Sequence, residues 1–389
     1  MTHLLLIIIY LAFISMGLPD SLLGSAWPVM YKEFGTPVSY AGIISMIIAA
    51  GTIISSLQSG RLTRRLGTGN LTVASVVITA VALIGFSSSH SFGILCLWAV
   101  PYGLGAGSVD ASLNNYVALH FPSRHMNWLH CMWEIGASAD PYIMGYVLTG
   151  GQGWNMGYKY IGILQIMLSG ILIVSLPLWN QDSNDRTRPD SDGSGSTPLS
   201  FRDIIKIPGS KEIMVTFFCY CALEQTTGLW AGSYLVLDRG WQAESAAGYA
   251  GLFFIGITAG RALSGFLSIK LNDMKMIRLG QILAFSGIIM LFIPFGKITP
   301  LIGLVLTGFG CAPVYPCMLH STPQHFGTDN SQSMIGVQMA AAYTGTCFMP
   351  FLFGLAANHL DASLFPFYLT LILFIMVIMH ELALKRCNN

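Results

Sequence analysis

Residues 1–28, MTHLLLIIIYLAFISMGLPDSLLGSAWP, are apolar enough to cross a membrane, yet they contain a carboxylate, Asp20. About 20 consecutive apolar residues span a bilayer as a helix, and one carboxylate inside such a helix costs about 2.5 to 3.5 kcal/mol. No Lys or Arg precedes the apolar run and no A-x-A cleavage site interrupts it, so we expect a first membrane span rather than a signal peptide. The aspartate then needs a specific reason to be there.

The composition of the whole chain also indicates a membrane protein. Of 389 residues 53% are hydrophobic and 10% charged, and the mean hydropathy is +0.62, whereas soluble domains carry roughly 25% charged residues. The net charge of +1 gives no basic field for nucleic acid. The eight cysteines lie mostly in apolar stretches without paired metal-ligand spacing, so we expect buried thiols, no metal and no cofactor.

The apolar pattern predicts an all-α membrane protein with twelve transmembrane helices in two six-helix bundles. The helices are expected at residues 4–30, 39–60, 70–88, 92–119, 128–149, 159–179, 212–237, 246–268, 277–296, 300–322, 333–357 and 363–383. The one long polar stretch is rich in Ser, Asp, Gly and Pro and cannot bury a core. We therefore expect an N-terminal bundle at 1–179, a cytoplasmic linker at 180–211 and a C-terminal bundle at 212–389.

The positive charges predict the orientation in the membrane. With a cytoplasmic N-terminus, fifteen of the nineteen Lys and Arg residues fall inside, and the four outside are Lys32, Lys159, Arg239 and Lys297. Positive residues concentrate on the cytoplasmic side of membrane proteins. We expect both termini and the linker in the cytoplasm and the protein in the plasma membrane, the inner membrane of a bacterium.

The two halves of the chain contain similar short motifs at a constant spacing. SGRLTRRL at 59–66 and SGFLSIKL at 264–271 share the form S-G-x-L-[ST]-x-[RK]-L at an offset of 205 residues, and GLG at 103–105 meets GFG at 308–310 at the same offset. Parallel repeats of this kind surround a central binding site in many transporters. The sequence therefore predicts a duplicated six-helix unit.

Five acidic residues fall inside predicted helices, and they are Asp20, Asp110, Glu134, Asp140 and Glu224. The only helical Arg or Lys away from the helix ends is Arg261, placed toward the cytoplasmic end of its helix, so basic partners for these acids are expected to be missing. The acids must then hold protons, bind a small cation or line a wet cavity.

This pattern predicts proton coupling through Asp20, Asp110, Glu134 and Glu224, and sodium remains an alternative. Without a midplane cation an anionic substrate is disfavoured, and a neutral, hydroxyl-rich or weakly cationic one fits better. Glu134 shares a helical stripe with His130, which is either a core histidine or a proton relay.

The neighbours of Asp110 suggest recognition of hydroxyl groups. Asn114 lies four residues on and shares its helical face, and Asn115 is adjacent. Amides donate and accept hydrogen bonds and a carboxylate accepts them. We predict that Asp110, Asn114 and Asn115 bind substrate, although the two amides can also serve as interhelical glue.

The remaining candidates for substrate contact flank the other acids. Trp27 lies on the helical face of Asp20, and its ring offers a flat surface for a sugar. Gln225 and Trp230 lie near Glu224 in the seventh predicted helix. Each tryptophan can equally be a packing residue.

With these motifs the chain resembles the major facilitator superfamily along nearly its whole length. GRLTRRLG after the second helix is similar to that superfamily's loop motif, without its acidic residue. The resemblance implies a cytoplasmic gate, for which we name Arg61, Arg64, Arg65 and Arg261. Asp20 in GLPDSLLGSAWP and Asp110 in GLGAGSVDASLNNYV resemble acids of the fucose:proton symporter family, which implies that they bind sugar and carry the coupling proton.

We therefore expect a monomeric, proton-coupled symporter that takes up a neutral sugar or polyol by alternating access. A drug:proton efflux antiporter shares the excess of buried acids, and a non-transporting membrane receptor is a further alternative. An enzyme is not expected, because the sequence shows no metal cluster, nucleophile elbow or phosphate loop.

Overall fold

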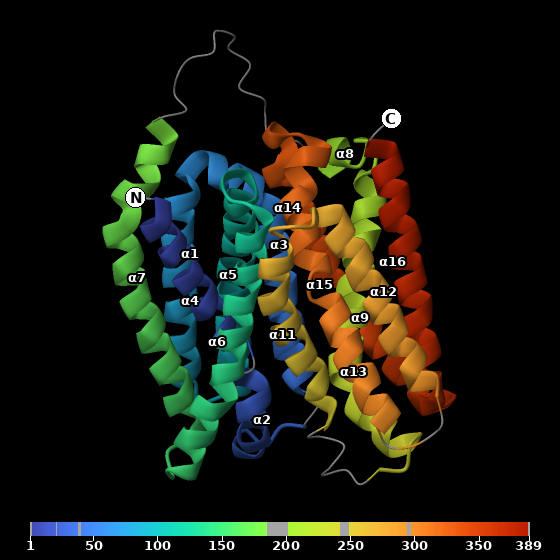
Figure 1. The fold of residues 1–389 in the computed structure, drawn as a ribbon. Helices are drawn as coiled ribbons and strands as arrows, with labels where there is room; N and C mark the ends of the chain where they lie inside the picture. The colour runs from blue at the N-terminus through green and yellow to red at the C-terminus, as the bar shows by residue number, and fades with distance from the viewer. Residues whose placement is uncertain are drawn as a thin grey trace. The chain divides into compact units, whose positions relative to one another are not determined.

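The computed structural model describes residues 2–20, 22–37, 40–184, 201–241, 249–293, 296 and 298–387. Within these ranges every regular element is a helix and no β-strand occurs (Figure 1). The helices are α1 Thr2–Gly17, α2 Leu22–Glu33, α3 Ala41–Leu66, α4 Thr68–Ser87, α5 Phe92–His120, α6 Ser123–Thr149, α7 Trp154–Asn184, α8 Phe201–Ile204, α9 Ser210–Leu237, α11 Leu252–Leu267, α12 Asp273–Phe292, α13 Ile298–Cys311, α14 Val314–Phe326, α15 Thr328–His359, the short 3₁₀ helix η2 Ala362–Leu364, and α16 Phe365–Cys387.

The predicted all-α membrane fold is confirmed. In the described part of the chain, nine helical stretches are long and apolar enough to cross a membrane. The predicted spans at 128–149, 212–237 and 246–268 correspond to α6, α9 and α11, which are more polar or shorter, and they complete the expected twelve. Residues 21, 39, 246–248 and 294–295 of the predicted spans lie outside the described residues.

The first span breaks just before Asp20. α1 ends at Gly17, and Pro19 has no N–H with which to continue the helix. The N–H of Asp20 donates to the carbonyl of Gly17 at 3.0 Å, three residues back rather than four. The expectation that Asp20 and Trp27 share a continuous helical face is therefore wrong, because Asp20 lies in a turn between two helices.

Backbone contacts divide the chain into two compact units. Unit 1 comprises Met1–Tyr116 and Leu129–Leu199, and unit 2 comprises Val117–Trp128 and Ser200–Asn389. The end of α5 and the start of α6 thus group with the C-terminal half of the sequence. The domain boundaries expected from the sequence stay a prediction, and residues 185–200 of the expected linker lie outside the described residues.

In unit 1, α4 packs along α7, and α1 and α2 also contact α7. Small hydroxyl side chains join α3 to α5: Thr52 donates to the carbonyl of Gly103 at 3.2 Å, and the hydroxyls of Ser55 and Ser108 lie 2.6 Å apart. These bonds satisfy polar groups that lipid cannot. They fix the helix that carries Asp110.

In unit 2, α9 packs on α15 and α16, while α13 packs on both α11 and α12 (Figure 1). α14 contacts α12 and α15. The side chain of Asn272 caps α12 by accepting a bond from the N–H of Lys275 at 3.0 Å. This cap starts α12 directly at Asp273.

The helix packing repeats at the offset found in the sequence. A Cβ on Gly103 would lie 2.3 Å from the carbonyl oxygen of Ile48, and a Cβ on Gly308 would lie 2.1 Å from that of Phe253. Both members of the second pair lie 205 residues after those of the first. The predicted internal duplication is therefore confirmed in these close helix crossings.

A second close crossing brings α1 against α6. A Cβ on Gly136 would lie 2.1 Å from the carbonyl oxygen of Ile14, and a Cβ on Gly17 would lie 2.1 Å from that of Trp133. Only glycine permits backbones to approach so closely. The crossing sets the turn at Asp20 beside the middle of α6.

We expect Gly136→Ala to destabilise the protein by about 1 to 3 kcal/mol or more, because the added methyl group forces α1 and α6 apart. The matched control is Gly145→Ala in the same helix, where a Cβ meets nothing within 4 Å. Thermal unfolding of the two purified variants in detergent measures the difference. Equal unfolding temperatures would show that the crossing is not tight.

Candidate functional site

A buried chain of polar side chains connects α5 to α6. Asn114 donates from Nδ2 to Oδ1 of Asp110 at 2.8 Å, and its Oδ1 lies 3.1 Å from Nε2 of His130. The exposed fractions of Asp110, Asn114 and His130 are 4%, 0% and 6%, and Asn115 is also buried. Because the amide oxygen only accepts, Nε2 of His130 carries the proton of that bond. The predicted pairing of Asp110 with Asn114 is confirmed, and an imidazole extends it.

A second group of side chains surrounds the turn at Asp20. Trp133 of α6 donates from Nε1 to Oδ2 of Asp20 at 3.4 Å, and Glu134 interacts with Asp20 electrostatically. Phe13 of α1 packs edge-on against both His130 and Trp133, with ring centroids 5.7 and 6.0 Å apart. The ring of Phe13 thus contacts one side chain of each group, Trp133 beside Asp20 and His130 in the chain of Asp110. Both groups of side chains belong to unit 1.

Unit 2 holds its buried acid differently. Nη2 of Arg261 lies 3.3 Å from Oε1 of Glu224, and the two side chains are 6% and 13% exposed. The expectation that the buried acids have no basic partner is therefore wrong for Glu224. The ring of Tyr220, one turn earlier on α9, is tilted against that of Tyr315 at 5.3 Å. Tyr220 also interacts electrostatically with Glu224 and Arg261.

Three residues predicted to contact substrate are Trp27, Trp230 and Gln225. The two tryptophans pack within their own units, and Gln225 is exposed. Trp27 is buried in an apolar cluster, where its ring meets Phe92 edge-on. Trp230 donates from Nε1 to the carbonyl of Pro350 at 2.9 Å and joins α9 to α15. Gln225 is exposed on α9.

The basic residues expected to form a gate fall in two places. Arg61, Arg64 and Arg65 are exposed in the last turns of α3, where cations are favoured by the helix dipole. Nη1 of Arg61 lies 3.4 Å from Oε1 of Gln58. Arg261 instead lies inside α11 beside Glu224. The gate stays a prediction.

Asp140, whose role the sequence leaves open, is fully buried in α6. It interacts electrostatically with Tyr102 of α5 and Tyr158 of α7. This places Asp140 on a different side of α6 from Glu134, as their spacing of six residues requires.

Sequence reasoning missed two partners that define the site. His130 completes the chain of Asp110 and Asn114, and the only available signal was its helical stripe with Glu134. Arg261 pairs with an acid 37 residues away, and helical spacing gives no hint of such a contact. Both depend on how neighbouring helices are rotated.

The two sites differ in what they can do chemically. In unit 1 a carboxylic acid and an imidazole can each take up or release a proton, and the amide between them can donate and accept hydrogen bonds with hydroxyl groups. In unit 2 a carboxylate and a guanidinium neutralise each other in a poorly solvated place. In the described ranges no group of three or more His, Cys, Asp and Glu side chains could hold a metal ion.

A multi-pass helical membrane protein with an internal duplication and buried acids in both repeats has the architecture of a secondary transporter. The sequence model described as Major Facilitator Superfamily matches residues 9–350. The chain therefore belongs to the Major Facilitator Superfamily. It is a transporter of small molecules rather than an enzyme.

Curated relatives are distant and diverse. The chain is 23% identical over 404 residues to Bypass of stop codon protein 6 of Saccharomyces cerevisiae, covering 95% of this chain and 79% of the yeast protein. It is 21% identical over 277 residues to the cis,cis-muconate transport protein of Acinetobacter baylyi, covering 68% and 65%. It is 21% identical over 316 residues to the glucose/mannose transporter GlcP of Bacillus subtilis, covering 80% and 77%.

Solved structures share the fold. The transporter FucP in its outward conformation matches with a TM-score of 0.77 at 15% identity, covering 96% of this chain and 98% of that one. The proton:xylose symporter XylE matches with a TM-score of 0.76 at 12% identity, covering 97% and 94%. At such identities the likeness concerns the fold alone.

Proposed function

We propose that this transporter takes up a neutral sugar or a similar polyol together with protons, by exposing one binding site alternately to the two sides of the membrane. The observation that carries the proposal is the buried chain of Asp110, Asn114 and His130. Its carboxylate and amide match hydroxyl groups as acceptors and donors. Its acid and imidazole are groups that form proton relays within membranes.

The acids around this chain support proton coupling. Asp20 and Glu134 lie close enough to interact electrostatically. A proton taken up by one of them removes one of two neighbouring negative charges. The transporter with a protonated acid then changes the side to which its binding site is open more easily than the transporter with a charged acid. Substrate and proton therefore move together.

The similar proteins favour the same substrate class. XylE is a proton:xylose symporter and GlcP a glucose/mannose transporter by name. Their identity to this chain is low, so they support a sugar as the first substrate class to test and do not select one sugar.

The test is uptake into proteoliposomes that contain the purified full-length protein. We expect at least one radiolabelled hexose, pentose or polyol to accumulate above its external concentration when the outside is made acidic, and a protonophore to abolish this. Flow in the opposite direction under the same gradient would instead indicate drug:proton antiport. Uptake of every compound at the level of empty vesicles would refute sugar transport.

A carboxylate is a second substrate class, favoured by the buried Arg261. A guanidinium is the side chain best suited to bind carboxylates, and one relative is named for transport of cis,cis-muconate. The hydroxyl of Tyr220 is buried with no hydrogen-bond partner among the described residues and lies near this pair. Dicarboxylates therefore belong in the same uptake panel, and their accumulation without that of sugars would select this class.

We also propose the topology expected from the charges: termini and linker in the cytoplasm, insertion in the plasma membrane, and a monomer as the working unit. Labelling of single added cysteines from either side of the membrane tests the first point. Light scattering of the purified protein tests the last.

A further inference from the structure

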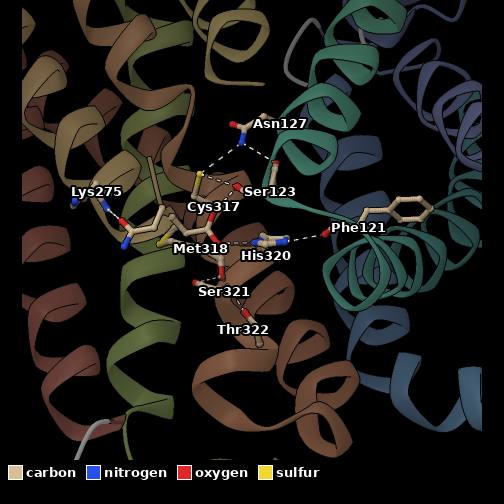
Figure 2. A network of polar contacts seen from close by, with 11 residues as sticks. Phe121, Ser123, Asn127, Lys275, Cys317, Met318, His320, Ser321 and Thr322 are labelled. Atoms are coloured by element: carbon tan, nitrogen blue, oxygen red, sulfur yellow. Dashed lines mark hydrogen bonds and ion pairs between the residues drawn. The ribbon is translucent and has the colours of Figure 1, made fainter. Parts of the chain in front are cut away.

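Three polar residues tie residues 117–128 to α12 and α14 within unit 2 (Figure 2). Ser123 donates to Oδ1 of Asp273 through a short hydrogen bond. Nδ1 of His320 lies 2.6 Å from Oδ2 of Asp273, and Nε2 of the same ring lies 2.9 Å from the carbonyl oxygen of Phe121. His320 and Asp273 are only 12% and 10% exposed.

The number of hydrogen-bond donors in this network bears on its protonation. Both ring nitrogens of His320 face oxygen atoms, and the carbonyl oxygen of Phe121 can only accept a hydrogen bond. The carboxylate of Asp273 accepts from Ser123 on its other oxygen. A neutral imidazole has one N–H and cannot satisfy both contacts, whereas an imidazolium satisfies both.

We propose that His320 and Asp273 form a proton-binding site whose bound proton fastens residues 117–128 to α12 and α14. The proton resides on the ring of His320, because imidazole is a stronger base than carboxylate. If Nε2 loses its proton, the bond to Phe121 is lost. If Nδ1 loses its proton, a lone pair faces the carboxylate. Either loss removes a hydrogen bond of His320. The packing of residues 117–128 on α12 and α14 therefore weakens as the pH rises.

Other titratable groups nearby have other partners or lie outside the contact. Cys317 and His325 of α14 interact with Asp273. Of the other titratable groups on the packed elements, Arg124 bonds to His125 on residues 117–128, where the partly buried His120 also lies, and Arg278 of α12 pairs with Glu381 of α16. Lys275 of α12 and Asp329 of α15 are exposed. His320 and Asp273 are thus in direct contact, and the thiol of Cys317 is a further titratable group beside Asp273.

The site lies where the chain passes from one compact unit to the other. Residues 117–128 group with unit 2, while α5 before them and α6 after them belong mainly to unit 1. Asn127 adds a bond from Nδ2 to the carbonyl of Ser123 at 3.1 Å and a contact to Sγ of Cys317 at 3.6 Å (Figure 2). These contacts position the segment, and the charged pair supplies the part that responds to pH.

The first test is hydrogen–deuterium exchange of peptides covering residues 117–128 in the full-length protein, between about pH 6 and about pH 9. After correction for intrinsic exchange, we expect the wild type to exchange roughly tenfold faster at the upper pH, as loss of one charge-assisted hydrogen bond implies. His320→Gln cannot titrate and should exchange fast at both pH values.

The matched control is His90→Gln, which changes an exposed histidine of unit 1, leaves both contacts of His320 in place and should keep the wild-type response. Corrected rates in the wild type that do not change with pH would overturn the proposal. So would a His320→Gln variant that keeps the wild-type response.

A second measurement reads the proton itself and does not depend on a variant that folds perfectly. In protein labelled with ¹⁵N-histidine, the resonances missing from His320→Gln belong to His320. We expect both of its nitrogens to be protonated near neutral pH, and a neutral tautomer there would overturn the assignment. Neither test requires sugar transport, so the proposal can fail or stand independently of the proposed function.

Discussion

Asp110→Asn is expected to abolish accumulation of substrate against its gradient while exchange of substrate across the membrane continues. Asparagine has the shape of aspartate and keeps an oxygen for Nδ2 of Asn114, but it cannot take up a proton. A difference of about two pH units drives roughly 100-fold accumulation through one coupled proton. In the variant the ratio of internal to external substrate should fall to about one.

Two assays on the same proteoliposomes separate coupling from binding. Uptake driven by an acidic exterior measures coupling, and counterflow of labelled against unlabelled substrate without a pH gradient measures binding and movement. The control is Asp203→Asn, which removes an acid that is 48% exposed and paired with Lys206. This variant should accumulate substrate like the wild type.

The outcome for Asp110→Asn decides between two roles of the buried chain. Loss of accumulation with counterflow retained assigns the coupling proton to this acid. Loss of both assays in a folded variant assigns Asp110 to substrate binding alone. Accumulation at the wild-type level would contradict a coupling role, and the coupling proton would then have to be sought at Asp20, Glu134 or Glu224.

The fold follows from the sequence because its main signals are local. Runs of about 20 apolar residues define the helices, and the repeat of SGRLTRRL in SGFLSIKL predicts the duplication that the crossings at Gly103 and Gly308 reproduce. The pairing of Asp110 with Asn114 was also local, since four residues make one helical turn. These features need no knowledge of how separate helices are rotated.

The partners of the buried acids follow from tertiary structure. Whether His130 meets Asn114 depends on the rotation of α6 about its axis, which the glycine crossing at Gly136 fixes. The contact of Arg261 with Glu224 depends on how α11 lies against α9. The wrong prediction of a continuous helix through Asp20 was avoidable. Pro19 stands directly before Asp20, and the missing N–H of a proline gives reason to expect a broken helix there.

The second large effect concerns the ion pair in unit 2. Arg261→Ala is expected to lower the free energy of unfolding by about 3 to 5 kcal/mol, because it leaves the carboxylate of Glu224 buried without its cation. The exposed pair of Arg278 and Glu381 is the matched comparison, with N–O distances of 2.7 and 2.8 Å and side chains that are 49% and 42% exposed. Arg278→Ala should cost only about 0 to 1 kcal/mol.

A double variant distinguishes a missing partner from a lost side chain. Glu224→Gln combined with Arg261→Gln removes both charges and keeps polar groups of similar length, so it should recover much of the stability that Arg261→Ala loses. Thermal unfolding of the four proteins at one pH in one detergent measures this. Equal losses for Arg261→Ala and Arg278→Ala would mean that Glu224 is already neutral in the folded protein, and the acid would then be available to carry a proton rather than to hold the arginine.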